Sequence, residues 1–187
     1  MAENVDALAG RLQSLIEDAA GLPPIEQWHP ELSGDIDIRI ARDGQWYYQG
    51  EPMAREALVR LFAGILRRED DQSYYLITPV EKWRLQVDDL PFVAHSLEID
   101  NAGAQQQLYL TTNTGERLAI SPAHPLQVDH CPQTGEPRPW VYVRRGLEAR
   151  ILTSAFYDLA EIAEPQGDGD HFGVWSGGTF FLLGRGA

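Results

Sequence analysis

Arginines close to aromatic residues are the side chains in this sequence best suited to binding a ligand. A guanidinium forms paired hydrogen bonds to phosphate or carboxylate, and an aromatic ring gives a planar base a surface for stacking. These arginines stand against an acidic background at Arg39, Arg42, Arg67, Arg68, Arg84, Arg144 and Arg145. Surface arginines are common, so the pattern indicates a type of site and does not specify a reaction.

Two pairs of carboxylates, Asp35 with Asp37 and Asp88 with Asp89, could in principle do acid-base chemistry. That chemistry needs one carboxyl group whose pKa is raised by burial. The neighbours of these residues are polar and include glycine and glutamine, which favours solvated turns. We therefore expect no catalytic residue among them.

The segment "HPLQVDHC" comes closest to a metal-binding cluster, but its spacing is unfavourable. Zinc sites usually need four well-spaced nitrogen or sulfur ligands, and adjacent His130 and Cys131 point apart in an extended chain. Cys131 would need a nearby base to act as a nucleophile. The sequence also lacks a P-loop, a GxGxxG motif and a GxSxG motif. We predict neither a metal nor a cofactor.

Composition limits the partners and the compartment. The 187-residue chain carries a formal charge of -13, which argues against binding duplex nucleic acid or an anionic membrane through bulk electrostatics. Cys131 is the only cysteine, so no intrachain disulfide can form and a reducing compartment fits. The N-terminus lacks the basic start and continuous apolar block of a secretion signal, and no segment is apolar enough to span a bilayer. We expect a cytoplasmic protein.

The periodicity of apolar residues predicts alternating helices and strands. An amphipathic N-terminal helix is ended by Gly21 and carries Val5, Leu8, Leu12, Leu15, Ile16 and Ala19 at helical spacing. We expect it to pack on its own chain. An extended connector, "GLPPIEQWHP", follows. The remaining elements expected in the first half are strands at 36–40 and 45–49, a helix within 51–68 and strands at 74–78 and 83–87.

The hairpin in "GDIDIRIARDGQWYYQG" has two possible registers. A three-residue loop of Arg42, Asp43 and Gly44 pairs Ile40 with Trp46, Ile38 with Tyr48 and Arg39 with Tyr47. The isoleucines and two aromatics then form a core face, and burying each such side chain contributes about 1.5 to 3 kcal/mol. A two-residue loop would instead align Arg39, Trp46 and Tyr48 on an open face. We expect the first register.

We expect the second half to repeat the order of the first: strand, turn, strand, helix, strand, turn, strand. Strands at 92–99, 107–112 and 117–121 and a loop at 122–138 precede the second copy. That copy comprises a hairpin at 140–152, a helix at 153–163 and a hairpin at 171–184 that turns on Gly177 and Gly178. A three-residue loop of Arg144, Arg145 and Gly146 should pair Val143 with Leu147 and Val141 with Ala149, because all four then share one face.

Several motifs, taken in order, resemble one uncharacterised bacterial family, domain of unknown function 1285. They are "GLPPIEQWHP", "GDIDIRIARDGQWYYQG", "REALVRLFAGILRR", "YYLITPVEKWRLQVDD" and "LPF". The resemblance implies a duplicated α+β core, a C-terminal half superficially similar to pleckstrin-homology-like folds, and a cleft between the halves. It also implies a small ligand, with a nucleotide-based one as the plausible class, and a role in signalling. No catalytic set comes with the family.

We therefore expect an α+β protein with an N-terminal helix and duplicated units, divided into residues 1–91 and 92–187. The leading hypothesis is a non-enzymatic ligand-binding protein whose site lies in the cleft between the halves. The residues expected to line that site are Trp28, Arg39, Trp46, Tyr48 and Arg84.

Two other functions remain open. One is a metal-dependent hydrolase that uses Asp35, Asp37, Asp88 or His29. The other is a protein-interaction module that docks through its N-terminal helix.

Overall fold

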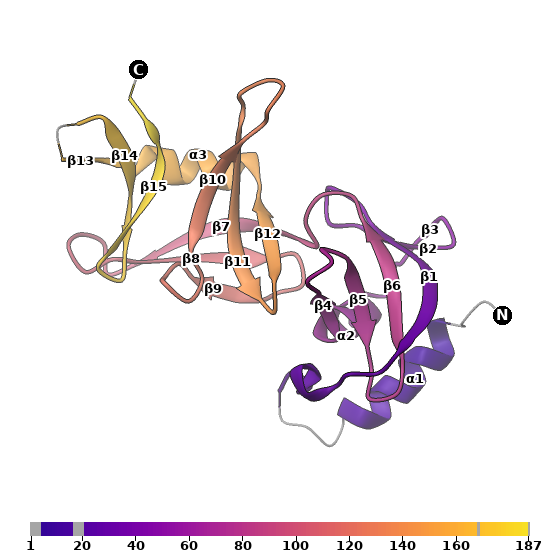
Figure 1. Cartoon of the computed structure of the whole chain (residues 1–187). Coiled ribbons are helices and arrows are strands. Elements are labelled where there is room, and N and C mark those ends of the chain that lie inside the picture. The colour runs from indigo at the N-terminus through magenta and orange to yellow at the C-terminus, as the bar shows by residue number, and fades with distance from the viewer. Residues whose placement is uncertain (1–4, 17–20, 168, 187) are drawn as a thin grey trace. The chain divides into compact units, whose positions relative to one another are not determined.

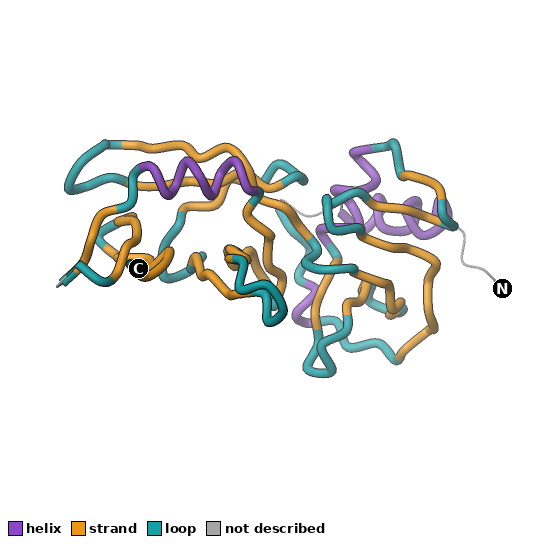
Figure 2. Tube along the Cα trace, turned by 90° about the horizontal axis from the view of Figure 1, so that it is seen from above, coloured by secondary structure: helices purple, strands orange, loops and turns teal. Residues whose placement is uncertain are grey.

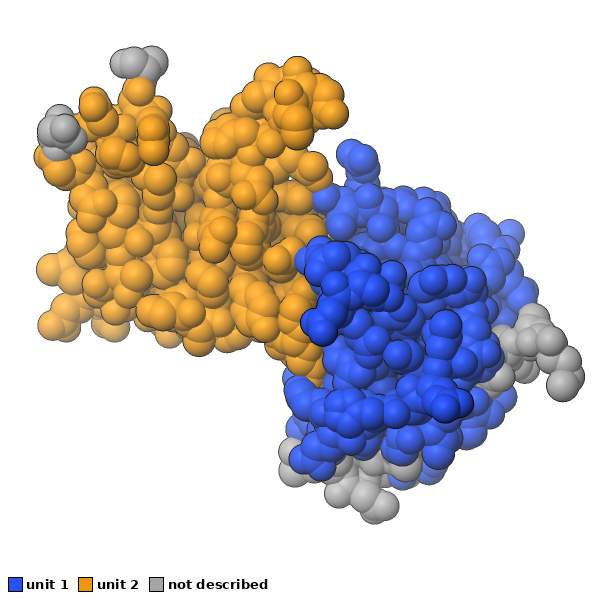
Figure 3. All heavy atoms as spheres, viewed as in Figure 1, with its two compact units in different colours: residues 1–89 blue, residues 90–187 orange. Residues whose placement is uncertain are grey.

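The computed structural model describes residues 5–16, 21–167 and 169–186 and divides the chain into two compact units, residues 1–89 and 90–187 (Figures 1 and 3). The first unit contains, in chain order, α1 (Val5–Ile16), the 3-10 helix η1 (Ile25–Gln27), β1 (Leu32–Ile40), β2 (Trp46–Tyr48), β3 (Glu51–Pro52), α2 (Glu56–Gly64), β4 (Leu66–Arg68), β5 (Tyr74–Ile77) and β6 (Lys82–Val87).

The six strands of the first unit form one curled sheet in the order β3-β2-β1-β6-β5-β4 (Figure 1). All neighbours are antiparallel except β1 and β6, which are parallel. Helices α1 and α2 contact each other, and Leu8 and Leu12 of α1 are fully buried. The N-terminal helix therefore packs on its own chain as expected, although Ala19 of the predicted stripe lies outside the described residues.

The predicted register of the first hairpin is confirmed. Ile40 pairs with Trp46, Ile38 with Tyr48 and Arg39 with Tyr47. Gly44 closes the three-residue loop with a φ of +84°, a conformation that glycine adopts without steric cost. Ile38, Ile40 and Trp46 are each at most 1% exposed, so burial of this face decided the register.

Two predictions for the first unit are corrected. The connector at 21–30 is not extended throughout, because Ile25–Gln27 forms η1 and buries Ile25. The helix expected within 51–68 ends at Gly64, and Leu66–Arg68 forms strand β4 against β5. Ile65 and Leu66 are fully buried in this arrangement too. Their spacing therefore continued the helical pattern of apolar residues beyond the residue where the helix ends. The predicted surface pair from Glu56 to Arg60 is present at 3.3 Å.

The second unit contains β7 (Phe92–Asp100), β8 (Gln107–Thr112), β9 (Arg117–Ala119), β10 (Leu126–His130), β11 (Pro137–Arg144), β12 (Leu147–Ile151), α3 (Thr153–Glu161), β13 (Glu164–Gln166), β14 (His171–Ser176) and β15 (Thr179–Arg185). One sheet has the order β10-β11-β12-β7-β8-β9, and β13-β14-β15 form a separate sheet. Helix α3 packs against β7 and β14, and Figure 2 shows it running alongside the strands.

Strand β10 lies within the segment expected to be a loop at 122–138, so that prediction is wrong. Leu126 is buried and pairs with Val141 of β11, and Val128 pairs with Pro139. The alternation of Leu126, Gln127 and Val128 is a short strand pattern. Prolines on both sides obscured it in the sequence.

The turn between β11 and β12 also differs from the prediction. Val141 pairs with Ala149 as expected, but Leu147 lies opposite Arg144, and the register shifts between Tyr142 and Arg144. The loop has two residues, Arg145 and Gly146, with φ of +52° and +74°, which is typical of a type I′ turn. The shift is a bulge at Val143. It keeps Val143 and Leu147 at most 2% exposed, so burial is preserved by a different geometry.

The two six-stranded sheets indicate a duplication whose boundaries differ from those expected. Each sheet consists of two three-stranded antiparallel meanders joined by one parallel pair, β1 with β6 in the first and β7 with β12 in the second. In both, the first strand of one meander pairs with the last strand of the next. The predicted second copy at 140–184 is therefore misplaced, because its hairpin β14–β15 belongs to the separate sheet.

Candidate functional site

The outer face of the first sheet concentrates polar side chains. Ile36, Ile38 and Ile40 of β1 are buried, so Asp35, Asp37 and Arg39 point to the opposite face. The neighbouring strands add residues of the same face, because directly paired residues lie on one side of a sheet. These pairs are Asp35 with Arg84, Arg39 with Gln86 and Arg39 with Tyr47.

This face contains a pocket of about 630 Å³, which falls in the size range of small-molecule sites. Its lining comes from β1, β2, β6 and the turn after β2, and comprises Asp35, Ile36, Asp37, Ile38, Arg39, Tyr47, Gly50, Arg84, Leu85 and Gln86. Every lining residue belongs to the first unit. The pocket thus has two guanidiniums, two carboxylates and one aromatic ring.

Arg39 is held in place from two sides. Its Nη1 donates to Asp88 Oδ2 at 2.6 Å, and its guanidinium carbon lies 4.8 Å from the centre of the Tyr47 ring. Gln86 Nε2 donates to the other oxygen of Asp88 at 3.1 Å. The Arg39 side chain is still 43% exposed, so its remaining N–H groups can reach a ligand.

Arg84 forms a two-pronged contact with Asp35. Its Nε donates to Oδ1 at 2.7 Å and its Nη2 to Oδ2 at 3.0 Å. The hydrogen bond from Arg84 holds the pKa of Asp35 below its ordinary value, and Asp35 raises the pKa of Arg84 in return. Both side chains are largely exposed, so the pair adds little stability and orients the guanidinium.

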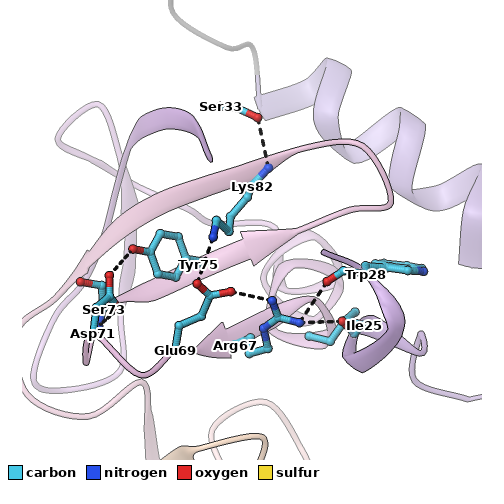
Figure 4. Close-up of polar contacts among 9 residues, drawn as sticks. All are labelled: Ile25, Trp28, Ser33, Arg67, Glu69, Asp71, Ser73, Tyr75 and Lys82. Carbon is cyan, nitrogen blue, oxygen red and sulfur yellow. Dashed lines mark hydrogen bonds and ion pairs between the residues drawn. The ribbon is translucent and has the colours of Figure 1, made fainter. Parts of the chain in front are cut away.

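A second polar network adjoins the pocket, since Tyr75 of β5 lies opposite Arg84. Figure 4 shows the polar contacts of Tyr75 in this network. The Tyr75 hydroxyl donates to Asp71 Oδ2 at 2.6 Å, which lowers the pKa of Asp71 and raises that of Tyr75. Lys82 Nζ lies 5.0 Å from the centre of the Tyr75 ring and donates to Glu69 Oε2 at 3.0 Å. This network fixes the side chains at one border of the pocket.

Arg67 connects this network to the N-terminal connector (Figure 4). Its Nη2 donates to Glu69 Oε1 at 2.6 Å, and its Nη1 donates to the carbonyls of Ile25 at 2.8 Å and Trp28 at 3.2 Å. Partial burial alone would raise the pKa of Glu69, but hydrogen bonds from Arg67 and Lys82 bring it below its ordinary value. The cluster therefore has a structural role, which is to hold η1 against β4.

The five residues expected to line the site lie in different places. Arg39 and Arg84 line the pocket together. Trp28 contributes its carbonyl to Arg67, and Trp46 is 1% exposed within the core. Tyr48 shares the face of Trp46 and lines a smaller pocket of about 290 Å³ near α1. The alternation along β2 separates Tyr48 and Trp46 from Arg39.

Sequence reasoning missed Tyr47, Gln86 and Asp88 as pocket or support residues. The hairpin register already placed Tyr47 opposite Arg39, so this residue could have been found. Gln86 and Asp88 meet Arg39 only through the parallel pairing of β1 with β6. No local pattern in the sequence indicates that pairing.

The residues of the segment considered for metal binding each have their own contacts. Within the described ranges, no three His, Cys, Asp or Glu side chains form a group that could hold a metal ion. His124 Nδ1 lies 3.1 Å from the Tyr142 carbonyl, and Asp129 accepts from the Trp140 indole at 2.8 Å. Hydrogen bonding at the turn lowers the pKa of Cys131, chiefly through Thr134. No helix in the described part of the chain has the length and apolar character needed to cross a membrane.

The fold and the pocket define an α+β protein of two units, each with a six-stranded sheet of the same topology. The chain belongs to the DUF1285 family. Residues 23–90 match the domain of unknown function (DUF1285), N-terminal domain, and residues 91–183 match the protein of unknown function (DUF1285), C-terminal domain.

Two solved structures are similar to the chain. A DUF1285 family protein from Silicibacter pomeroyi DSS-3 is 43% identical, with a TM-score of 0.87 over 99% of this chain and 97% of that one. A DUF1285 family protein from Shewanella baltica OS155 is 27% identical, with a TM-score of 0.52 over 67% of this chain and 91% of that one. No curated protein matches the chain.

Proposed function

We propose that this protein is a non-enzymatic ligand-binding protein, and that the pocket on the outer face of its first sheet binds a nucleotide-type small molecule. One observation carries the proposal: two oriented arginines, one of them stacked on a tyrosine, line a single pocket of ligand size. The cleft between the halves, expected from the sequence as the site, remains a prediction.

The chemistry of the pocket suits the separate parts of a nucleotide. The guanidiniums of Arg39 and Arg84 can donate to phosphate oxygens, and the stacked Arg39–Tyr47 pair offers a flat surface to a base. Asp37 has an exposed carboxylate that can accept from a ribose hydroxyl or an exocyclic amine.

An anionic ligand must compete with Asp35 and Asp88 for these arginines. Exposed ion pairs of this kind contribute about 0 to 1 kcal/mol each, so exchanging a carboxylate for a phosphate costs little. The same carboxylates repel a ligand that carries negative charge and has no hydrogen-bond donor to offer them. The pocket should therefore prefer a ligand that carries both a phosphate and hydrogen-bond donors.

The test is a thermal-shift screen of nucleotides at millimolar concentration, followed by titration of the best ligand. The Arg39→Ala and Arg84→Ala variants should each weaken binding by about tenfold, the effect of one charged hydrogen bond. Arg117→Ala is a matched control, because Arg117 in the second unit also pairs with a carboxylate, Glu98, and lies over a tyrosine ring at 3.4 Å.

Two results would count against the proposal. One is that no nucleotide stabilises the protein at millimolar concentration. The other is that Arg117→Ala weakens binding as much as Arg39→Ala does, because the effect would then reflect general charge and not this pocket.

The proposal includes a cytoplasmic signalling role, and a likeness of the second unit to pleckstrin-homology-like folds. A curled sheet followed by the single helix α3 supports this likeness. The net charge of -13 supports a similarity limited to the fold, without binding to anionic membranes.

A further inference from the structure

Two edge strands of different sheets border a groove in the second unit. Among the described residues, β10 pairs only with β11, and β15 pairs only with β14. The groove between β10 and β15 has a volume of about 490 Å³. It shares no lining residue with the pocket of the first unit.

The lining of the groove is mostly apolar, with Gln127 of β10 as a polar member. Leu126 and Val128 of β10 line one side, and Leu182 and Leu183 of β15 line the other. Leu126 and Leu183 are buried, whereas Leu182 is 41% exposed. Leu182 therefore presents apolar surface that a ligand with a hydrocarbon body would cover.

One end of the groove carries the guanidinium of Arg185 and the imidazole of His130. Strands β10 and β15 run in the same direction (Figure 1), so their final residues, His130 and Arg185, lie at the same end. His171 pairs with Arg185 across β14 and β15. No carboxylate lines the groove.

Arg185 differs from most arginines of this acidic protein. Arg39, Arg84 and Arg117, for example, each form an ion pair with a carboxylate. The Arg185 side chain forms no hydrogen bond or ion pair with any described residue and is exposed. Its charge is thus available to an anion at the mouth of an apolar groove.

We propose that this groove binds an anionic amphiphile, a small molecule with a hydrocarbon chain and a carboxylate head. The chain lies between Leu126, Val128, Leu182 and Leu183, and the head bonds to Arg185 beside His130. A guanidinium forms paired hydrogen bonds to a carboxylate, and the apolar walls exclude a ligand that is charged along its length.

Isothermal titration calorimetry with decanoate, decyltrimethylammonium and acetate tests whether binding needs both the hydrocarbon chain and the negative head group. Decanoate should bind, whereas acetate lacks the chain and decyltrimethylammonium has the wrong charge. The overall field of a protein with a net charge of -13 attracts the cation, so a preference for decanoate would have to come from the groove itself.

Substitutions then locate the site. Arg185→Gln should weaken decanoate binding about tenfold, and Leu182→Gln should weaken it further by removing apolar contact. Arg42→Gln is the matched control: Arg42 is another exposed arginine without an ion pair to a described residue, and it lies in the first unit. Circular dichroism of each variant shows that its fold is retained.

Equal binding of decanoate and decyltrimethylammonium would overturn the proposal, as would equal weakening by Arg185→Gln and Arg42→Gln. Absence of decanoate binding at millimolar concentration would overturn it directly. A preference for decanoate that disappears in Arg185→Gln and persists in Arg42→Gln would establish the site.

Discussion

Replacing Ser176 by alanine should lower the unfolding free energy by about 2 kcal/mol, because the Ser176 hydroxyl bridges Leu108 of β8 and Ile120, the residue after β9. Ser176 is fully buried at the end of β14. Its Oγ accepts from the Leu108 amide at 3.0 Å and donates to the Ile120 carbonyl at 2.7 Å. The hydroxyl thus takes the place of a direct hydrogen bond from the Leu108 amide to the Ile120 carbonyl.

The size of this stability loss depends on which hydrogen-bonding groups lose their partner in Ser176→Ala. The Ile120 carbonyl keeps a second hydrogen bond, from Gln107 Nε2 at 2.9 Å, so it stays satisfied in the variant. The Leu108 amide loses its hydrogen bond to Ser176, and a buried donor without a partner costs about 1 to 3 kcal/mol. A value near the middle of this range is therefore expected.

Urea denaturation followed by intrinsic tryptophan fluorescence measures this cost. The Ser176→Ala variant should show a lower midpoint with an unchanged slope, and Ser154→Ala, at an exposed serine on α3, should match the wild type. If Ser176→Ala also falls within about 0.5 kcal/mol of the wild type, the strands close the gap by themselves and the reasoning is refuted.

Two further predictions concern packing and pH. Gly173→Ala should destabilise the protein by several kcal/mol or prevent folding, because the added Cβ would lie 2.2 Å from the Phe181 carbonyl oxygen. Gly184→Ala is the control, because a Cβ at that position meets nothing within 4 Å. Thermal denaturation compares the two variants, and similar melting temperatures would contradict the packing argument. The lowered pKa of Glu69 means that its ion pairs stabilise the fold above its unfolded pKa of about 4.5 and are lost as pH falls through the folded value. Urea titrations of wild type and Glu69→Gln should therefore differ by at most about 1 kcal/mol near pH 7 and converge near pH 3, and a gap that widens in acid would show that the sign is wrong.

The candidate pocket illustrates how much of a site a sequence can predict. Arg39 and Arg84 were expected at a site because arginines near aromatics suit anionic ligands, and the pocket contains both. Trp46 and Tyr48 were expected there too, although the preferred hairpin register already assigned them to the opposite face. These aromatics were expected there because they lie in the segments that resemble the family, and the alternation of the strand separates them from Arg39.

Local patterns were sufficient to predict several elements that bury one face. The sequence by itself determined the register of the first hairpin, since pairing Ile40 with Trp46 and Ile38 with Tyr48 buries all the large apolar side chains but Tyr48, which stays partly exposed. It also determined the N-terminal helix, helix α3 and the turn on Gly177 and Gly178.

Only the tertiary structure decided how the strands join into sheets. The parallel pair of β1 with β6 brings together Asp35 and Arg84, and Arg39 and Asp88, each pair 49 residues apart in the chain. The same kind of pairing in the second unit joins β7 to β12 and leaves the hairpin β14–β15 in a sheet of its own. Apolar periodicity specifies which face of a strand is buried and carries no information about which distant strand lies beside it, so the pocket and the groove emerge only when the chain is folded.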